Sequence, residues 1–474
     1  MSLSFVSIFL GLGLLMFLAY KGNSIIWVAP LCAALVALLS GISPLTAFTG
    51  WKLNAGANGG AGGLDTGYMA GAANYFLQWF PAFFLGAVYG KVMDMTGSAR
   101  SLAEALVKLI GPKQAVLAVV LPCMLMTYGG ISLFVVVFVI YPMGYAIYRA
   151  ANLPRTLLPG AIAFGAFGIT MTTVPGTPQI QNVIPSRFYG LMGLVEENGA
   201  MVEKLVTPTT AMAAVALSIV GMIVIGVPGY LYLQWEAGKA RKALRGFEED
   251  PKFEEGAKGA DLPKWHWLAG LLPIIAVVVV FNVFKQPLVI ALLCGIVLCC
   301  LINIQQYKIL LPSISAGANG SLTAIMNTSC AVGFGTVVQM VPGFASLRDS
   351  MLGMPGNILF SQSVAVNVLA GATGSASGGM SIALGALGAR YREMAMTIAN
   401  GVEEKAYYIN ELLHRVASQS SGGLDTLPHN GAVLTLLAVS HCTHKESYKG
   451  VFITTCLIPT VISMLLALVW GFFI

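Results

Sequence analysis

The chain has 474 residues, of which 57% are hydrophobic and only 10% are charged. A soluble domain carries roughly 25% charged residues, so this composition excludes an ordinary soluble protein and predicts an integral membrane protein. The net charge of +6 does not indicate nucleic-acid binding, because the basic residues cluster in loops, as they do on the cytoplasmic side of membrane proteins.

Apolar segments recur along both halves of the chain, and a span needs about 20 such residues to cross a bilayer core. The expected spans, in chain order, are 3–20, 24–43, 67–95, 156–185, 208–234, 266–284, 287–304, 317–345, 407–440 and 449–473. We expect the first to be a retained span and not a cleaved signal, because it lacks a basic leader and a small-residue cleavage site. Five spans per half is an odd number, so the second half must be inserted upside down.

The predicted fold is therefore all-α and membrane-spanning, with two inverted-topology repeats. The first repeat covers 1–235 and the second covers 265–474. Between them, 236–264 is the only long hydrophilic stretch, and the positive-inside rule places it in the cytoplasm as a linker. Both termini are then expected outside.

A pair of apolar arms lies between the third and fourth span of each half. The first pair occupies 114–150 and the second 357–390. Most of these arms are too short to cross comfortably, so each pair is predicted to form a re-entrant hairpin. The arm 133–150 is long enough to span, and that alternative stays open.

Short motifs are repeated between the halves in the same order, at offsets of 249 to 253 residues. The segment 127–132 resembles 376–381, 173–178 resembles 426–431, and 85–88 resembles 334–337. Two of these motifs interrupt apolar segments. Matching interruptions in two halves indicate the substrate site of a secondary transporter.

Each hairpin contains a Gly-Gly-x-Ser motif, which lets the chain turn sharply and brings a serine to the start of a new helix. Helix N-termini offer unpaired N–H groups and a positive dipole end, which suit a carboxylate. The alternative is that these glycines only allow tight helix packing. The duplication favours substrate binding by Gly129, Gly130, Ser132, Gly378, Gly379 and Ser381.

Prolines and glycines predict discontinuous helices at 156–185 and 407–440. A proline removes a backbone donor and frees a carbonyl, so the break can hold a cation or a substrate hydroxyl. A purely structural kink is the alternative. Neutral donors and acceptors surround the breaks, and of these we assign the substrate to Thr173, Thr177, Thr426 and Asn430; Gln179 and Gln181 lie nearby.

Asp425 and His429 flank the second break and are the candidates for ion coupling. Ionisable residues at membrane depth are costly and usually functional, and an imidazole can exchange a proton near neutral pH. The alternatives are a helix cap for Asp425 and a neutral, hydrogen-bonded His429. On the same predicted helix, Glu411, His414 and Arg415 share one face, as pathway residues or as a buried structural pair.

Four segments carry a resemblance to the gluconate permease family of organic-acid:proton symporters, and within it to the branch of 3-hydroxybutyrate permeases. They are 85–91, 128–134, 427–433 and 443–448. The similarity spans essentially the whole chain. It implies the ion-transporter superfamily fold, with two re-entrant hairpins and two discontinuous helices at a midplane site. It also implies a homodimer, multiple spans in the inner membrane and an elevator movement.

The chain departs from the sugar-acid permeases of that family at 173–178, which contains no histidine. A smaller or less hydroxylated substrate than gluconate is therefore expected, such as a short hydroxy- or keto-monocarboxylate. No nucleotide-binding loop, metal-ligand cluster or nucleophile–base spacing is present in the sequence. We thus expect no enzyme, no metal and no cofactor, with a proton gradient as the energy source and sodium as the alternative. The expected partners are the organic acid and membrane lipid.

Overall fold

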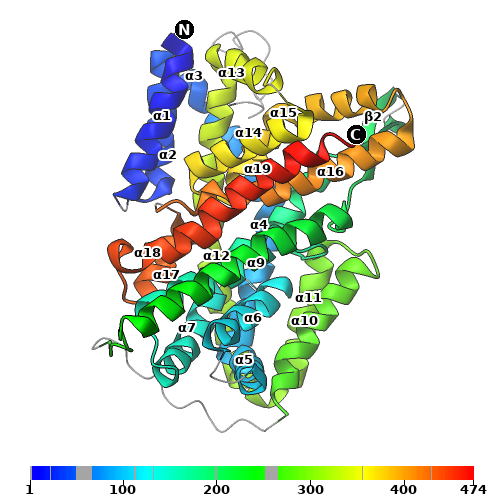
Figure 1. Ribbon diagram of the computed structural model, residues 1–474. Coiled ribbons are helices and arrows are strands. Elements are labelled where there is room, and N and C mark those ends of the chain that lie inside the picture. The colour runs from blue at the N-terminus through cyan, green and yellow to red at the C-terminus, as the bar shows by residue number, and fades with distance from the viewer. Residues whose placement is uncertain are drawn as a thin grey trace.

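The computed structural model of the protein describes residues 3–21, 23–49, 67–110, 114–131, 133–197, 200–250, 265–354, 356–428 and 430–474. Two expected site residues, Ser132 and His429, lie outside the described residues, as does the second part of the expected linker, 251–264. The described part is mainly helical (Figure 1), in agreement with the helical membrane protein that the composition predicts.

The first half begins with helices and ends with one long helix after a short sheet. Its α-helices are α1 (Leu3–Tyr20), α2 (Ile25–Leu39), α3 (Pro44–Thr49), α4 (Gly67–Met95), α5 (Ser98–Ile110), α6 (Ala115–Tyr128), α7 (Leu133–Ala150), α8 (Leu158–Ala163) and α9 (Val215–Lys242). Short helical turns are η2 (Arg155–Leu157), η3 (Phe164–Thr170), η4 (Ile180–Asn182) and η5 (Ile184–Arg187), and the strands are β1 (Gly190–Glu197) and β2 (Ala200–Pro208).

The second half contains only helices among its described residues. They are α10 (Trp267–Asn282), α11 (Leu288–Ile302), α12 (Tyr307–Met340), α13 (Gly343–Leu352), α14 (Ile358–Thr373), α15 (Ala376–Ile398), α16 (Glu403–Ser421), α17 (Gly431–Val439), α18 (His444–Val451) and α19 (Ile458–Trp470). Short turns are η6 (Ile304–Gln306), η7 (Leu424–Thr426) and η8 (Phe452–Leu457).

Within the described residues, three helical stretches are both long and apolar enough to cross a membrane. They are Val215–Lys242, Ile304–Met340 and His444–Trp470. Shorter apolar helices account for several of the other expected spans, among them α1, α2, α10 and α11. The protein is thus a helical membrane protein, although fewer segments reach full spanning length than the ten that hydropathy predicts.

The helices of one half pack against those of the other in matching pairs. The two long helices α4 and α12 lie along each other, α2 packs on α12 and α11 packs on α4. At the ends, α1 contacts α13 and α10 contacts α5. A Cβ at Gly343 would lie 2.4 Å from the Phe5 nitrogen, and one at Gly270 would lie 2.4 Å from the Ser98 oxygen. Figure 1 shows α1 and α2 at the upper left and α10 and α11 at the lower right.

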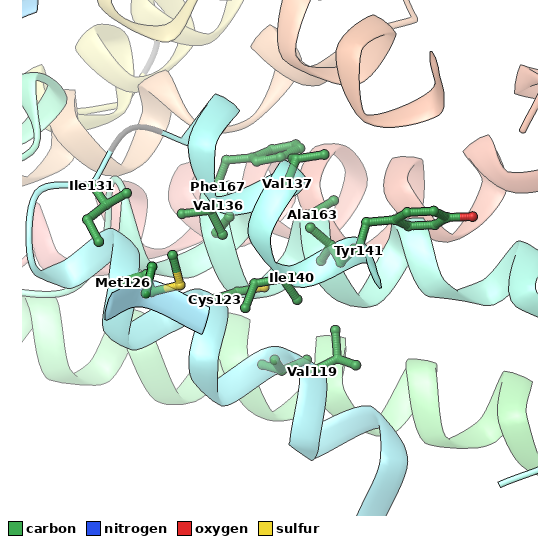
Figure 2. Close-up of a cluster of buried hydrophobic side chains, with 14 of the residues drawn as sticks. Val119, Cys123, Met126, Ile131, Val136, Val137, Ile140, Tyr141, Ala163 and Phe167 are labelled. Carbon is green, nitrogen blue, oxygen red and sulfur yellow. The ribbon is translucent and has the colours of Figure 1, made fainter. Parts of the chain in front are cut away.

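The two segments expected to form re-entrant hairpins each contain a pair of packed helices, α6 with α7 and α14 with α15. The first hairpin packs on the start of the broken helix through a buried apolar cluster (Figure 2). Its members include Val119, Cys123 and Met126 of α6, Val136, Val137, Ile140 and Tyr141 of α7, and Ala163 and Phe167 of α8 and η3. Apolar packing therefore fixes the hairpin tip relative to the helix break.

Both broken helices are observed, and both breaks are irregular. In the first half, α8 ends at Ala163, the π-helical segment η3 continues to Thr170, and only the short turns η4 and η5 follow before the sheet. In the second half, α16 ends at Ser421 and α17 begins at Gly431. The expected single spans 156–185 and 407–440 are thus each interrupted by unwound backbone, as the prolines and glycines predict.

A two-stranded antiparallel sheet between the first break and α9 was not expected. β1 pairs with β2 from Gly190↔Pro208 to Glu197↔Ala200, with an irregularity between Leu191 and Met192. The expectation of an all-α chain is wrong on this segment. A loop between two spans carries no hydropathy signal of its own, so the hairpin is visible only in the structure. Because β2 extends to Pro208, α9 begins at Val215, whereas a span beginning at residue 208 was expected.

The linker is partly folded, which its polar composition did not indicate. Helix α9 continues past the expected boundary at residue 235 to Lys242. The following segment docks on α7, where Glu249 accepts hydrogen bonds from Arg149 at 2.7 Å and from the Tyr145 hydroxyl at 2.8 Å. Buried Asp250 lies 2.7 Å from His441. The described end of the linker is therefore anchored beside the hairpin.

Candidate functional site

A cavity of about 420 Å³ lies where the two hairpins, the two breaks and the long helices α4 and α12 meet. Its polar lining residues are Asn23, Ser24, Gln179, Gln181, Asn327, Thr328, Thr373, Ser375, Ser377, Asp425 and Asn430. None of the described residues on its wall is Lys, Arg or His. An anion in this cavity would thus depend on neutral donors.

Two helices begin at the cavity wall with unpaired backbone donors. At α15, Ser375 caps the helix and accepts a hydrogen bond from the Gly378 N–H at 3.2 Å. The N–H groups of Ala376 and Ser377 have no acceptor among the described residues. At α17, the N–H of Gly431 is likewise unpaired. Unpaired N–H groups and the positive ends of two helix dipoles make this wall attractive to a carboxylate.

The first hairpin turn lies on the cavity as expected. Gly130 lines the cavity and has a φ of +86°, a conformation that favours glycine. Gly129 lies just behind it, where a Cβ would be 2.6 Å from Ile274. Gln179 of the first break donates to the carbonyl oxygens of Thr127 at 2.7 Å and Ile131 at 3.2 Å. This amide therefore connects the break to the hairpin turn.

In the second half, Asn430 connects the break to the second hairpin. Its Nδ2 donates to the Gly374 carbonyl at 3.0 Å. Its Oδ1 accepts from the N–H groups of Ala432 at 2.7 Å and Val433 at 3.0 Å. Asn430 lines the cavity, but its amide is already used to cap α17 and to connect it to the second hairpin.

The second hairpin turns earlier than the motif alignment suggests. Its turn is formed by Gly374, with φ of +60°, and by Ser375. Gly378 and Gly379 lie inside the first turns of α15 and do not line the cavity. A Cβ at Gly379 would lie 2.2 Å from the Cα of Ala370. The structure thus places these two glycines in the packing between the hairpin arms.

The remaining sequence-predicted residues lie near the cavity but behind its wall. Ser381 lies next to the Tyr75 hydroxyl of α4. Thr173 and Thr177 are buried in the first break, and the Thr177 carbonyl accepts from Asn182 at 2.9 Å. Thr426 donates to the Gly423 carbonyl at 3.1 Å. The structure brings Gly130, Asp425 and Asn430 together on the wall, and the other described candidates form the layer around them.

Asp425 is the ionisable side chain on the described wall. It is 2% exposed, and its Oδ1 has no hydrogen-bond partner. No Lys or Arg of the described residues forms a salt bridge with it. A buried carboxylate without a counter-charge and with one unsatisfied oxygen is costly, so this position favours a bound proton or cation.

Several wall residues were not expected from the sequence, of which Asn327 is the clearest. Asn327 comes from α12, and Ser375 and Ser377 come from the turn and start of α15. The side-chain oxygens of Asn327 and of Gln181 are buried without a donor. The signal for Asn327 was present in the run Asn327-Thr328-Ser329 within a long apolar helix, because polar residues at membrane depth are usually functional or pair helices.

Arg415 has a structural role that joins the two halves. It is fully buried and donates to Asn182 Oδ1 at 2.8 Å, to the Ala211 carbonyl at 2.8 Å and to the Ala213 carbonyl at 3.0 Å. On the same face, His414 contacts the Thr209 hydroxyl at 2.9 Å. These contacts hold α16 against the first break, away from the cavity wall.

No group of three or more His, Cys, Asp or Glu among the described residues could hold a metal ion. No protein-family model matches the chain. The chain is 36% identical over 496 aligned residues to a Bacillus subtilis (strain 168) protein named "Uncharacterized transporter YxjC", and the alignment covers 95% of each chain. This chain belongs to the same transporter family.

Proposed function

We propose that this transporter is a secondary active symporter that couples proton entry to uptake of a small organic anion. The substrate would be a short hydroxy- or keto-monocarboxylate such as 3-hydroxybutyrate. The observation that carries this proposal is the pair of helix starts, α15 and α17, whose unpaired N–H groups line a cavity with no cationic side chain among its described residues. Such donors suit one carboxylate.

The apolar part of the wall supports a short acid over a fully hydroxylated one. Phe83, Leu133, Phe167, Leu288 and Leu292 line the same cavity. A methyl end can pack on these side chains, whereas a chain of hydroxyl groups would leave several of its polar groups without partners there. A gluconate-type sugar acid is the alternative substrate, in line with the resemblance to the gluconate permease family.

Asp425 is the proposed carrier of the coupling proton. Its buried, unpartnered oxygen can be satisfied by protonation. A sodium ion is the second candidate, because Asp425 Oδ1, Asn327 Oδ1 and Gln181 Oε1 are all acceptors without donors. Oxygen acceptors of this kind suit a hard cation.

The matching contacts of the two halves support an arrangement of inverted repeats with alternating access. Segments expected outside gather together, since Tyr407 donates to the Pro208 carbonyl and Arg392 donates to the Phe188 carbonyl. Segments expected in the cytoplasm also meet, as Asp250 and His441 do. We propose that the hairpins and broken helices move together in an elevator-type step, in a multi-pass homodimer of the inner membrane.

The test is uptake of radiolabelled 3-hydroxybutyrate into proteoliposomes under an inward proton gradient without sodium, with unlabelled gluconate as competitor. Accumulation that collapses with a protonophore and resists gluconate is expected. Strong competition by gluconate would transfer the assignment to sugar acids. Accumulation only after sodium is added would replace the proton by sodium. Equilibration without accumulation would identify a passive channel or exchanger and contradict symport.

A further inference from the structure

Arg187 is a positively charged residue that does not line the cavity. Its guanidinium carbon lies 4.3 Å from the centre of the Trp79 ring. Trp79 is 4% exposed, whereas Arg187 is exposed. Among the described residues, no carboxylate forms a salt bridge with Arg187. Stacking on an aromatic ring holds a guanidinium in place without neutralising its charge, so this charge is both oriented and available.

Two connections place Arg187 close to the cavity. Along α4, Ala82 and Phe83 line the cavity and follow Trp79 by one helical turn, which is about 5 Å of rise. The Tyr75 ring lies next to the Trp79 ring, with centroids 6.4 Å apart. The Tyr75 hydroxyl neighbours Ser377, a wall residue at the start of α15. Arg187 therefore lies roughly one helical turn beyond the wall.

Arg187 lies on the side of the molecule that carries the β-hairpin. It closes η5, three positions before the first residue of β1. The neighbouring Arg392 is already used, because it donates to the Phe188 carbonyl at 2.7 Å. The side of the β-hairpin is the one that the topology predicts to face outside.

We infer that Arg187, held over Trp79, forms an anion-capture site at the mouth of the cavity, on the side of the β-hairpin. The ligand is a small carboxylate, and the inference rests on the proposed function. The charge attracts the carboxylate over several ångströms and raises its local concentration. The neutral N–H groups of α15 and α17 then receive it. Because none of the described wall residues is a Lys, Arg or His, the anion is attracted at the mouth without being held tightly by a cationic side chain of that wall.

The experiment compares Arg187→Gln and Arg187→Lys with the unmodified protein. Initial rates of radiolabelled 3-hydroxybutyrate transport are measured in right-side-out and inside-out membrane vesicles, at low and at high ionic strength. Lys405→Gln is the matched control, since Lys405 is exposed and lies near the same end of α16 as the β-hairpin contact of Tyr407. Expression and gel-filtration profiles check that each variant folds.

From the β-hairpin side, Arg187→Gln is expected to raise KM about three- to tenfold with kcat unchanged, since a rim charge changes encounter more than chemistry. The salt dependence of KM should weaken in this variant, because salt screens a charge over about 8 Å at physiological strength. Arg187→Lys should keep most of the wild-type KM. Transport from the opposite side and the Lys405→Gln control should not change.

An unchanged KM in Arg187→Gln at low ionic strength would overturn the capture site. A fall in kcat from both sides with KM unchanged would also overturn it, because that result describes a purely structural contact with Trp79. If the unmodified protein transports neither 3-hydroxybutyrate nor gluconate, the proposed function fails, and the inference fails with it. The first two outcomes leave the proposed function intact, so the two failures are distinguishable.

Discussion

Asp425 is the residue on which ion coupling depends in the proposed transporter. Its side chain is buried on the cavity wall with one oxygen unpartnered. Asparagine has nearly the same shape but cannot take up a proton or balance a cation. The residue thus combines a high cost of burial with the chemistry that coupling requires.

Asp425→Asn is expected to lower uptake driven by a proton gradient by about two orders of magnitude, since the coupling group is lost. Exchange of labelled for unlabelled substrate at equal pH should persist. Asp94→Asn is the control, because Asp94 pairs with Lys91 at 2.8 Å in a partly exposed position away from the cavity wall. Both are measured in proteoliposomes. Wild-type accumulation by Asp425→Asn would contradict the role.

Asn430 lines the cavity, but its side-chain amide is already hydrogen-bonded to the backbone. We therefore predict that it positions the second break and does not bind the substrate. Asn430→Asp keeps the oxygen that caps α17 and loses the donor to the Gly374 carbonyl. Asn430→Ala loses both, so it should cost about 0.5–2 kcal/mol of stability as other lost caps do. Thermal unfolding in detergent should rank wild type above Asn430→Asp and that above Asn430→Ala. Equal stability of all three would show that the cap contributes nothing.

At the scale of elements, the second hairpin depends on close contact between its two arms. The Cα of Ala370 in α14 lies where a Cβ of Gly379 in α15 would fall, 2.2 Å away. Backbone cannot move aside as a flexible side chain can. Helices that approach this closely need glycine at the contact.

Gly379→Ala is therefore expected to destabilise the protein by about 1–3 kcal/mol, as overpacking typically does. Gly385→Ala is a matched control in the same helix, because a Cβ there would meet only Gln339 Nε2, at 3.9 Å. The measurement is the thermal midpoint of both variants in detergent. If Gly385→Ala were the more damaging of the two, the packing argument would be wrong.

At the scale of the whole molecule, the two halves are joined by polar contacts as well as by apolar packing. Arg415 of α16 provides the only described donors to Asn182 Oδ1 and to the Ala213 carbonyl. These acceptors belong to the first half, and Arg415 belongs to the second. The guanidinium thus holds the first break in its observed conformation.

Arg415→Met should lower stability by roughly 2–6 kcal/mol, because each of the two buried acceptors left unpaired costs about 1–3 kcal/mol. Arg415→Lys should recover only part of this loss, since an ammonium cannot reproduce the fork of donors. Arg390→Met, at an exposed pair with Glu393, is the control. The fraction of monodisperse protein after heating measures all three. A Met variant as stable as the control would contradict a joining role.

The sequence by itself determined the helical membrane class and where helix is interrupted within 156–185 and 407–440, because hydropathy, glycine and proline act locally. It also singled out Gly130, Asp425 and Asn430, which line the cavity, since polar or turn-forming residues stand out within apolar segments of a sequence. The prediction of a turn at Gly378 and Gly379 is wrong, because the turn occurs at Gly374. Two similar motifs can begin at different distances from a helix start, and the similarity alone does not show this difference.

Only the tertiary structure decided which polar groups share one wall. Asn327 and Ser377 come from α12 and α15, which pack against each other, and the sequence around each residue does not show that the two line the same cavity. The β-hairpin, the docked end of the linker and the stacking of Arg187 on Trp79 likewise depend on contacts between distant segments. Such contacts are set by how the helices pack in three dimensions. The pattern of residues along one helix shows which face is apolar, but it does not show which distant segment packs on that face.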